Sequence, residues 1–196
     1  MLRIRQHKLI YVRIPRTGTH SMTAWLRENF KTRRVAHYHQ WQVPLKYQNW
    51  TVFTTVRHPI ERCFSYWWIS NRTDNPEPPD WSFDEFLEHL IDIRDTNYAI
   101  KQDIEVPKMD MNQTNYFKKS GATIYLQIEN IEQEVAVKLP FPEADKNQIG
   151  KLNIGLEKPK LDIKKYCTDK TLPLIDNYCG EDFNEFGYSW DGYRLC

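Results

Sequence analysis

The sequence predicts an α/β fold in three layers, with a central parallel sheet flanked by helices. Short runs of β-branched and aromatic residues recur along the chain, which is typical of buried strands. Each run gives way to a segment with the 3.6-residue period of a helix. Strands that alternate with helices favour a parallel sheet covered on both faces. The 196 residues are predicted to form a single domain, residues 1–196, large enough for a sizeable core.

The first predicted strand runs directly into a helix. The run Leu9-Ile10-Tyr11-Val12, with Ile14, has the pattern of a buried strand. Pro15 ends it because proline has no N–H to give to a ladder. Thr17-Gly18-Thr19 then predicts a tight polar turn. From Ser21 onward the apolar residues share one helix face: Met22, Trp25, Leu26 and Phe30.

This strand, turn and helix together predict an anion-binding site. Main-chain N–H groups at the start of a helix have no partner within it, and the helix dipole adds positive potential there. The guanidinium of Arg16 would add a charged donor to the same pocket. Further donors are expected from the hydroxyls of Thr17, Thr19 and Ser21. The alternative is an ordinary strand–helix connection, in which Thr and Ser are common caps.

The turn does not match a Walker A motif. That motif places a Lys directly after its last Gly, whereas the cation here, Arg16, precedes the single Gly18 by two residues. The sequence therefore favours a phosphate-like ligand held by different means. A P-loop-like nucleotide kinase is the less favoured alternative.

The remaining elements follow from the same two periodicities. Further strands are expected at 33–36, Trp50–Val56 and Ala122–Gln127. Helices are expected at 60–70, 82–93, about 130–137 and 171–178. Ser82 and Glu85 have the spacing of a capping box at the start of one of them. Residues 71–79 and 140–159 have loop composition, and residues 95–120 give no clear assignment.

A second candidate site follows the Trp50–Val56 strand. Arg57 stands at the carboxyl end of that strand, where open α/β sheets place ligand-binding groups. Ser65 comes eight residues later, about two turns into the next helix, and is expected to face the same cleft. An Arg with a hydroxyl makes a second anion site. The alternative is a strand-end Arg that is simply solvated.

Composition limits the classes of partner and the location. A net charge of +1 gives no reason to expect bulk nucleic-acid binding. No apolar run has the length of a membrane span, and the N-terminus lacks a signal-type apolar core. We therefore expect a soluble, cytoplasmic chain, although a lumenal domain cut from a longer precursor would look much the same. The four Cys show neither metal-ligand spacing nor a disulfide framework.

Taken together, the two stretches resemble the PAPS-dependent sulfotransferase family, in its carbohydrate (Golgi-type, sulfotransferase family 2-like) branch. Residues 14–21, IPRTGTHS, resemble its 5′-phosphosulfate loop. Residues 56–62, VRHPIER, with Ser65-Tyr66, resemble its 3′-phosphate motif, including the eight-residue spacing from Arg57 to Ser65. Weaker similarity at 82–87, 125–130, 152–153 and 182–188 extends the resemblance over most of the chain. Two positions depart from the family: Arg16 replaces the usual Lys, as in the tyrosylprotein branch, and His20 replaces Thr or Ser.

The resemblance implies a P-loop-like fold and a metal-free transfer from 3′-phosphoadenosine 5′-phosphosulfate (PAPS) that leaves 3′,5′-ADP. The implied acceptor is a hydroxyl or amine of a glycan or small metabolite. Arg16 is then the candidate to stabilise charge on the leaving phosphate oxygen. The resemblance implies donor-binding roles for Arg16, Thr17, Gly18, Thr19, His20, Ser21, Arg57 and Ser65.

The general base is expected to be a histidine, because imidazole titrates near neutral pH. His39 and His37 follow the predicted 33–36 strand and are the two candidates, since a His in a comparable stretch is thought to act as base in related heparan enzymes. The alternative is that both are loop residues without a role. Glu61 and Asp84 are expected to be structural, in a first helical turn and near a cap. A catalytically silent nucleotide-binding protein is the remaining alternative for the whole chain.

Overall fold

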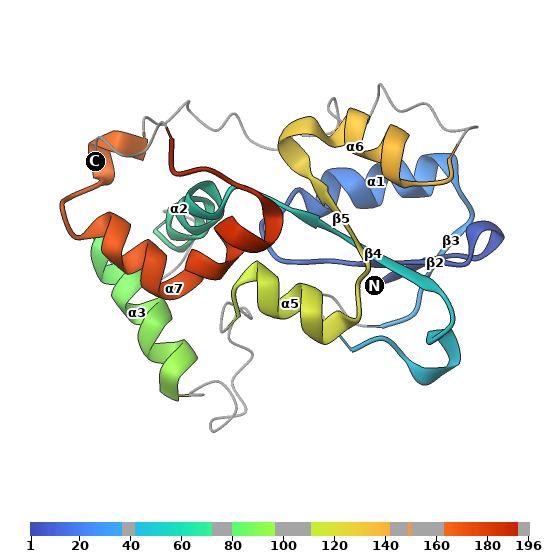
Figure 1. Cartoon of the computed structure of the whole chain (residues 1–196), viewed down its shortest axis with the longest axis horizontal. Coiled ribbons are helices and arrows are strands. Elements are labelled where there is room, and N and C mark those ends of the chain that lie inside the picture. Colours follow the sequence, from blue (N-terminus) through green and yellow to red (C-terminus); the bar gives the residue numbers. More distant parts are fainter. Residues whose placement is uncertain (37–41, 72–79, 97–110, 142–148, 150–162, 192–196) are drawn as a thin grey trace. The chain divides into compact units, whose positions relative to one another are not determined.

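The computed structural model describes residues 1–36, 42–71, 80–96, 111–141, 149 and 163–191. These residues form an α/β structure with one five-stranded sheet and six α-helices (Figure 1). The chain divides into two compact units. The first unit comprises Met1–Arg57 and Asn115–Glu157, and the second comprises His58–Thr114 and Lys158–Cys196. The expectation of a single domain stays a prediction.

The sheet belongs to the first unit and is mixed. Its strands are β1 (Leu2–Ile4), β2 (Leu9–Val12), β3 (Thr32–Arg34), β4 (Thr51–Val56) and β5 (Ile124–Gln127). They lie in the order β3-β1-β2-β4-β5. The pairs β2·β4 and β4·β5 are parallel, whereas β1 pairs antiparallel with both β2 and β3. The expected parallel sheet is therefore confirmed for three strands only.

The antiparallel edge arises from a short hairpin at the start of the chain. A single turn of 3₁₀ helix, Arg5–His7, joins β1 to β2, and Lys8 closes it with a left-handed backbone at φ 51°. The sequence analysis missed β1 because three residues are too few to display a period. The expected strand at 33–36 is found as β3, Thr32–Arg34, on the outer edge of the sheet.

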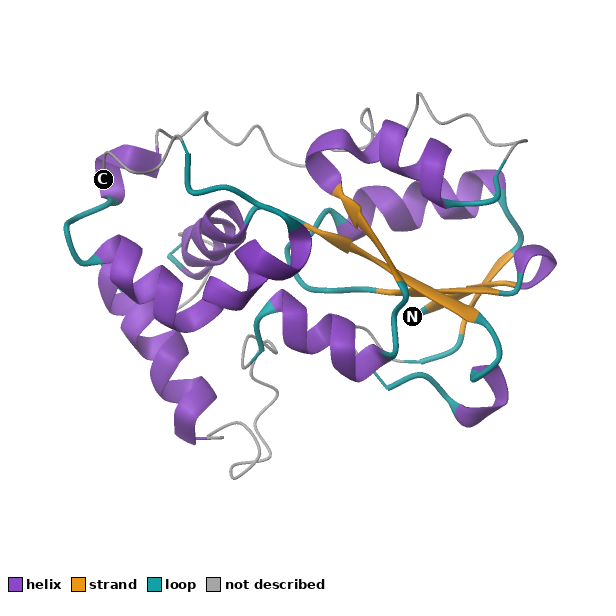
Figure 2. Ribbon diagram, in the orientation of Figure 1, coloured by secondary structure: helices purple, strands orange, loops and turns teal. Residues whose placement is uncertain are grey.

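Apolar side chains cover both faces of the sheet. On one face, Leu9 and Tyr11 of β2 pack with Trp25 and Leu26 of α1 (Thr19–Asn29). Val135 of α6 (Ile131–Lys138) joins the same cluster. The opposite face holds a second cluster: Met1, Ile10, Val12, Tyr47, Val52 and Ala122. Figure 2 shows α1 and α6 over one side of the orange strands and the helix at 113–120 over the other.

The second unit is helical. Its main helices are α2 (Pro59–Ser70), α3 (Phe83–Thr96) and α7 (Thr171–Phe186), which share one apolar cluster. The expected capping box is confirmed, because the Ser82 main-chain N–H and hydroxyl both donate to Glu85 Oε2 at 2.8 Å. The helix expected at 171–178 continues to Phe186 through a break at Cys179, where φ is −144° and ψ is 26°.

One helix, α5 (Gln113–Ser120), lies in the stretch that gave no clear assignment from sequence. Its first N–H groups are accepted by Asp182 of α7: Gln113 N–H at 3.1 Å and Thr114 N–H at 2.8 Å. The cap therefore comes from a residue 68 positions away, which no local pattern could reveal. Burial raises the pKa of the Asp182 carboxyl, and the nearby Arg62 guanidinium opposes that shift.

No helix within the described ranges is both long enough and apolar enough to cross a membrane.

Candidate anion-binding site

The carboxyl ends of three parallel strands meet at one edge of the first unit. Val12 of β2 pairs with Thr54 of β4, and Val56 of β4 pairs with Gln127 of β5. The segment Arg13–Gly18 follows β2, Arg57 follows β4, and a turn of 3₁₀ helix, Ile128–Asn130, follows β5. In open α/β sheets this is the edge at which ligands bind.

The segment Pro15–Gly18, here called the β2–α1 loop, has an unusual backbone. Arg16 has φ 67° and Gly18 has φ 70°, so left-handed residues stand on both sides of Thr17. Arg16 and Lys8 are the only non-glycine residues with positive φ in the described part of the chain. Such a conformation costs about 1 kcal/mol or more in a residue with a Cβ, and it concentrates at ligand sites. Turns of this kind aim successive N–H groups at one point and form anion-binding concavities.

Gly18 is favoured at its position by its backbone conformation, because its φ of 70° is one that residues with a Cβ rarely adopt. Its Cα lies close to Ile128, since a Cβ built on Gly18 would be 3.4 Å from Ile128 Cγ2. Gly18 is also the N-cap residue of α1. The start of α1 therefore follows the loop directly, and the N–H groups and dipole of a helix start favour an anion.

The side chains of the loop and first turn differ in exposure. Arg16 is half-buried, and His20 is exposed as the second residue of α1. Thr17, Thr19 and Ser21 are buried. The sequence therefore located the loop, but α1 begins at Thr19, two residues before the expected start at Ser21, and the structure places the three hydroxyls inside the fold.

The Thr17 hydroxyl is used within the protein. Its Oγ1 donates to the main-chain oxygen of Ile14 at 2.9 Å and lies 3.0 Å from Thr55 Oγ1. In this geometry its hydrogen is not offered to a ligand, in contrast to the expectation from sequence. The main-chain N–H of Thr17 remains the group expected to meet an anion.

Arg57 and Ser65, the predicted second anion site, belong to different units. Arg57 is half-buried directly after β4, at the strand end where the sequence predicted it. Ser65 is buried in α2 and belongs to the second unit. Their convergence on one ligand stays a prediction.

Of the four candidate acid–base residues, two are described by the structure and two are not. His37 and His39 lie outside the described residues. Glu61 is half-buried in the first turn of α2. Asp84 accepts hydrogen bonds from the hydroxyls of Thr168 and Thr171, an arrangement that agrees with its expected structural role. Among the described residues, no group of three or more His, Cys, Asp and Glu side chains could hold a metal ion.

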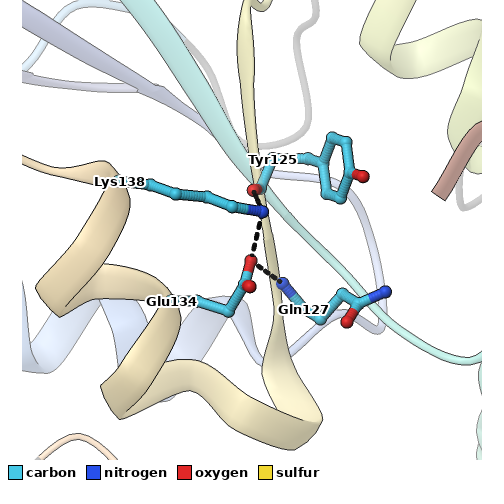
Figure 3. Close-up of polar contacts among 4 residues, drawn as sticks. All are labelled: Tyr125, Gln127, Glu134 and Lys138. Carbon is cyan, nitrogen blue, oxygen red and sulfur yellow. Dashed lines mark hydrogen bonds and ion pairs between the residues drawn. The ribbon is translucent and has the colours of Figure 1, made fainter. Parts of the chain in front are cut away.

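A polar cluster that sequence analysis did not single out holds the end of β5 (Figure 3). Glu134 Oε2 accepts the Gln127 main-chain N–H at 3.2 Å and the Lys138 ammonium at 2.6 Å. Lys138 Nζ also donates to the Tyr125 main-chain oxygen at 3.2 Å and lies 4.3 Å from the Tyr125 ring centre. Glu134 and Lys138 have helical i,i+4 spacing, which is the signal in the sequence that indicates such a pair. The cluster fixes the strand that leads into Ile128, the neighbour of Gly18.

Two hollows of about 350 and 400 Å³ lie on the first unit. One is lined by Val35, Ala36 and Gln42–Leu45, and the other by Thr123–Tyr125 with Lys138. Neither is lined by a residue of the β2–α1 loop. The candidate anion site is defined by its main-chain geometry, in which left-handed residues on both sides of Thr17 set the direction of the N–H groups.

Comparison of this chain with protein-family models, with curated proteins and with solved structures finds no match. What the site binds must be inferred from the chemistry of the loop and from the motifs of the sequence.

Proposed function

We propose that this chain is a PAPS-dependent sulfotransferase of the carbohydrate branch, with a P-loop-like site on its α/β fold. It would move a sulfonate group from PAPS to a hydroxyl or amine of a glycan or small metabolite. The observation that carries the proposal is the β2–α1 loop, in which left-handed Arg16 and Gly18 lead directly into the start of α1. That geometry coincides with the residues that resemble the family's 5′-phosphosulfate loop.

The proposed site binds the donor at two points. The N–H groups of residues 17–21 and the guanidinium of Arg16 would hold the 5′-phosphosulfate, because main-chain donors and a fixed positive charge suit a polyanionic group. His20, at the exposed first turn of α1, would lie beside the sulfonate. Arg57 and Ser65 would hold the 3′-phosphate and so select PAPS over nucleotides that lack it.

The proposed transfer is an in-line displacement at sulfur. A bond forms between the acceptor oxygen or nitrogen and sulfur, and the bond between sulfur and the bridging phosphate oxygen breaks. Negative charge grows on that bridging oxygen, where Arg16 and the loop N–H groups would stabilise it. The acceptor's proton passes to a general base, for which His39 is the first candidate and His37 the second.

A nucleotide-binding comparison tests the proposal and its alternatives. We expect 3′,5′-ADP to raise the melting temperature and ATP with Mg²⁺ to leave it unchanged, because only the former carries a 3′-phosphate. The reverse result would favour a nucleotide kinase and overturn the proposal. Transfer from sulfur-labelled PAPS to a panel of glycans then separates an enzyme from a silent nucleotide-binding protein. Binding of 3′,5′-ADP without turnover on any acceptor would favour the silent protein, which the departures at Arg16 and His20 keep in consideration.

A further inference from the structure

Three buried hydroxyl groups connect strands β2 and β4 to the β2–α1 loop. Tyr11 Oη lies 2.8 Å from Thr55 Oγ1, and Thr55 Oγ1 lies 3.0 Å from Thr17 Oγ1. Thr17 Oγ1 lies 2.9 Å from the main-chain oxygen of Ile14. All three side chains are fully shielded from solvent. We call this set the hydroxyl relay.

The direction of the hydroxyl relay follows from counting hydrogens. A carbonyl oxygen can only accept, so Thr17 must give its single hydroxyl hydrogen to Ile14. Thr17 can therefore only accept from Thr55, which then has no hydrogen left for Tyr11. Tyr11 must donate to Thr55. The three hydrogen bonds run one way, from Tyr11 to the loop, and each polarises the next.

The hydroxyl relay ends in the part of the loop where the backbone is left-handed. Thr17 stands between the two left-handed residues, Arg16 and Gly18. Its side chain is tied at one point to Ile14, just before the loop, and at another to Thr55 of the neighbouring strand. A residue held at two points keeps its peptide planes fixed, and the N–H groups on either side of it keep their direction.

We infer that Tyr11 and Thr55 are positioning residues for the anion site, acting through Thr17 without touching the ligand. The inference rests on the proposed function, because it gives the relay a role in binding and transfer from PAPS. Preorganised donors stabilise developing charge only while they stay aimed at it. Loss of the relay is therefore expected to affect both donor binding and turnover.

The chain contains a matched control on the same strand. Thr54 is adjacent to Thr55 and equally buried, but its side chain points to the other face of the sheet. Its hydroxyl donates to the main-chain oxygen of Val12 at 2.8 Å, within the strands and not to the loop. Replacing either threonine by valine removes one buried hydroxyl at nearly constant volume.

The experiment compares Thr55→Val, Thr54→Val, Thr55→Ser and Tyr11→Phe in the full chain. We measure the dissociation constant for 3′,5′-ADP, the turnover with PAPS and the melting temperature of each variant. Thr55→Val should weaken 3′,5′-ADP binding and lower turnover, each by about tenfold, which is the effect of about 1.4 kcal/mol. Thr54→Val should change both by less than about twofold at a similar melting temperature. Thr55→Ser keeps the hydroxyl and should restore binding, and Tyr11→Phe should give an intermediate loss.

Equal losses in Thr55→Val and Thr54→Val, or a Thr55→Val variant that binds like the wild type, would overturn the inference. If Thr55→Val does not fold, Tyr11→Phe compared with Thr55→Ser carries the same test. Amide hydrogen exchange at residues 16–19, measured without any ligand, tests the relay independently of the proposed function. Faster exchange there in Thr55→Val but not in Thr54→Val supports the relay even if the wild type binds no 3′,5′-ADP, which would reject the function alone. Unchanged exchange would reject the relay.

Discussion

The two units each contain a buried polar network, and the two networks differ in charge. In the first unit, the hydroxyl relay of Tyr11, Thr55 and Thr17 is neutral throughout. In the second unit, Asp182 accepts two N–H groups at the start of α5 and lies in the field of the fully buried Arg62. Arg62 in turn donates to the Met111 main-chain oxygen at 3.3 Å.

The difference assigns the two networks different roles. Removing one member of a buried charged set leaves the other charge without compensation, so such a set dominates stability. A neutral hydroxyl relay costs little to bury when every hydrogen is donated, and removing one hydroxyl leaves only an unpaired neutral group, at a cost of about 1–3 kcal/mol, which is less than for a charge. We therefore expect changes in the charged network to lower the free energy of unfolding, and changes near the relay to lower binding or turnover.

The largest effect is expected at Asp182. Asp182→Ala should lower the free energy of unfolding by about 3–5 kcal/mol, because it removes a negative charge that acts on the buried Arg62 and leaves two buried N–H groups of α5 without this acceptor. Urea unfolding measures it. Glu181→Ala, one residue earlier and exposed, is the control and should change stability by less than about 0.5 kcal/mol. Similar losses in the two variants would remove the distinction between the charged and neutral networks.

The next effect is expected at Arg16 and concerns turnover. Arg16→Ala should lower turnover by about 100- to 1000-fold, because charge on the bridging oxygen grows only in the transition state. Binding of 3′,5′-ADP should stay largely intact and fall far less than turnover, and the melting temperature should stay near the wild-type value. Arg27→Ala, at the exposed last turn of α1, is the control. Unchanged turnover in Arg16→Ala would remove the assignment of this residue to the leaving group.

A smaller effect is expected at Arg57, in ground-state binding. Arg57→Ala should weaken 3′,5′-ADP by about tenfold to hundredfold, since a charge-assisted hydrogen bond to phosphate contributes roughly 1.5–3 kcal/mol. Ser65→Ala should lose less, because a hydroxyl is a neutral donor. Binding of 5′-AMP, which lacks the 3′-phosphate, should barely change in calorimetry. Equal losses for the two nucleotides would mean that Arg57 only supports the fold.

Local signals made part of this structure predictable. The β2–α1 loop was readable because Pro15 ends a strand and Gly18 permits a left-handed turn before a helix. The start of α2 at Pro59 and the Ser82–Glu85 capping box depend on neighbours within a few residues. These features involve residues that are close together in the sequence, so a single sequence can reveal them.

Long-range pairing made the rest unpredictable. Strand β1 has only three residues, too few to display a period, and it is held by antiparallel pairing with both β2 and β3. Helix α5 depends on Asp182, and the buried position of Thr17 depends on Thr55, 38 residues away. A threonine pair in a buried strand, Thr54-Thr55, was the only trace of the relay in the sequence. The expected base, His39, lies outside the described residues and stays a prediction.

The smallest effect is expected at the Glu134–Lys138 pair at the end of β5. Lys138→Met keeps the apolar stem but removes the ammonium that donates to the Tyr125 oxygen and to Glu134 (Figure 3). The Lys138 side chain is 34% exposed and that of Glu134 is 18% exposed, so solvent screens the pair. We expect a loss of about 0.5–1 kcal/mol in the free energy of unfolding, decreasing as salt is raised. Lys119→Met, at the exposed end of α5, is the control for loss of a surface charge.

This pair also sharpens the comparison, because it is charged but belongs to the same unit as the neutral relay. If charge and burial together determine the loss of stability, Lys138→Met should lower the free energy of unfolding much less than Asp182→Ala, since the Lys138 ammonium keeps access to water. If position in the first unit determines the effect, Lys138→Met should instead weaken the binding of 3′,5′-ADP, because β5 leads into Ile128, whose side chain lies against Gly18. Unfolding and nucleotide binding, measured on the same variant, decide between them. A loss above about 3 kcal/mol in the free energy of unfolding would show that even a partly exposed ion pair can dominate stability, contrary to the different roles expected for the two networks.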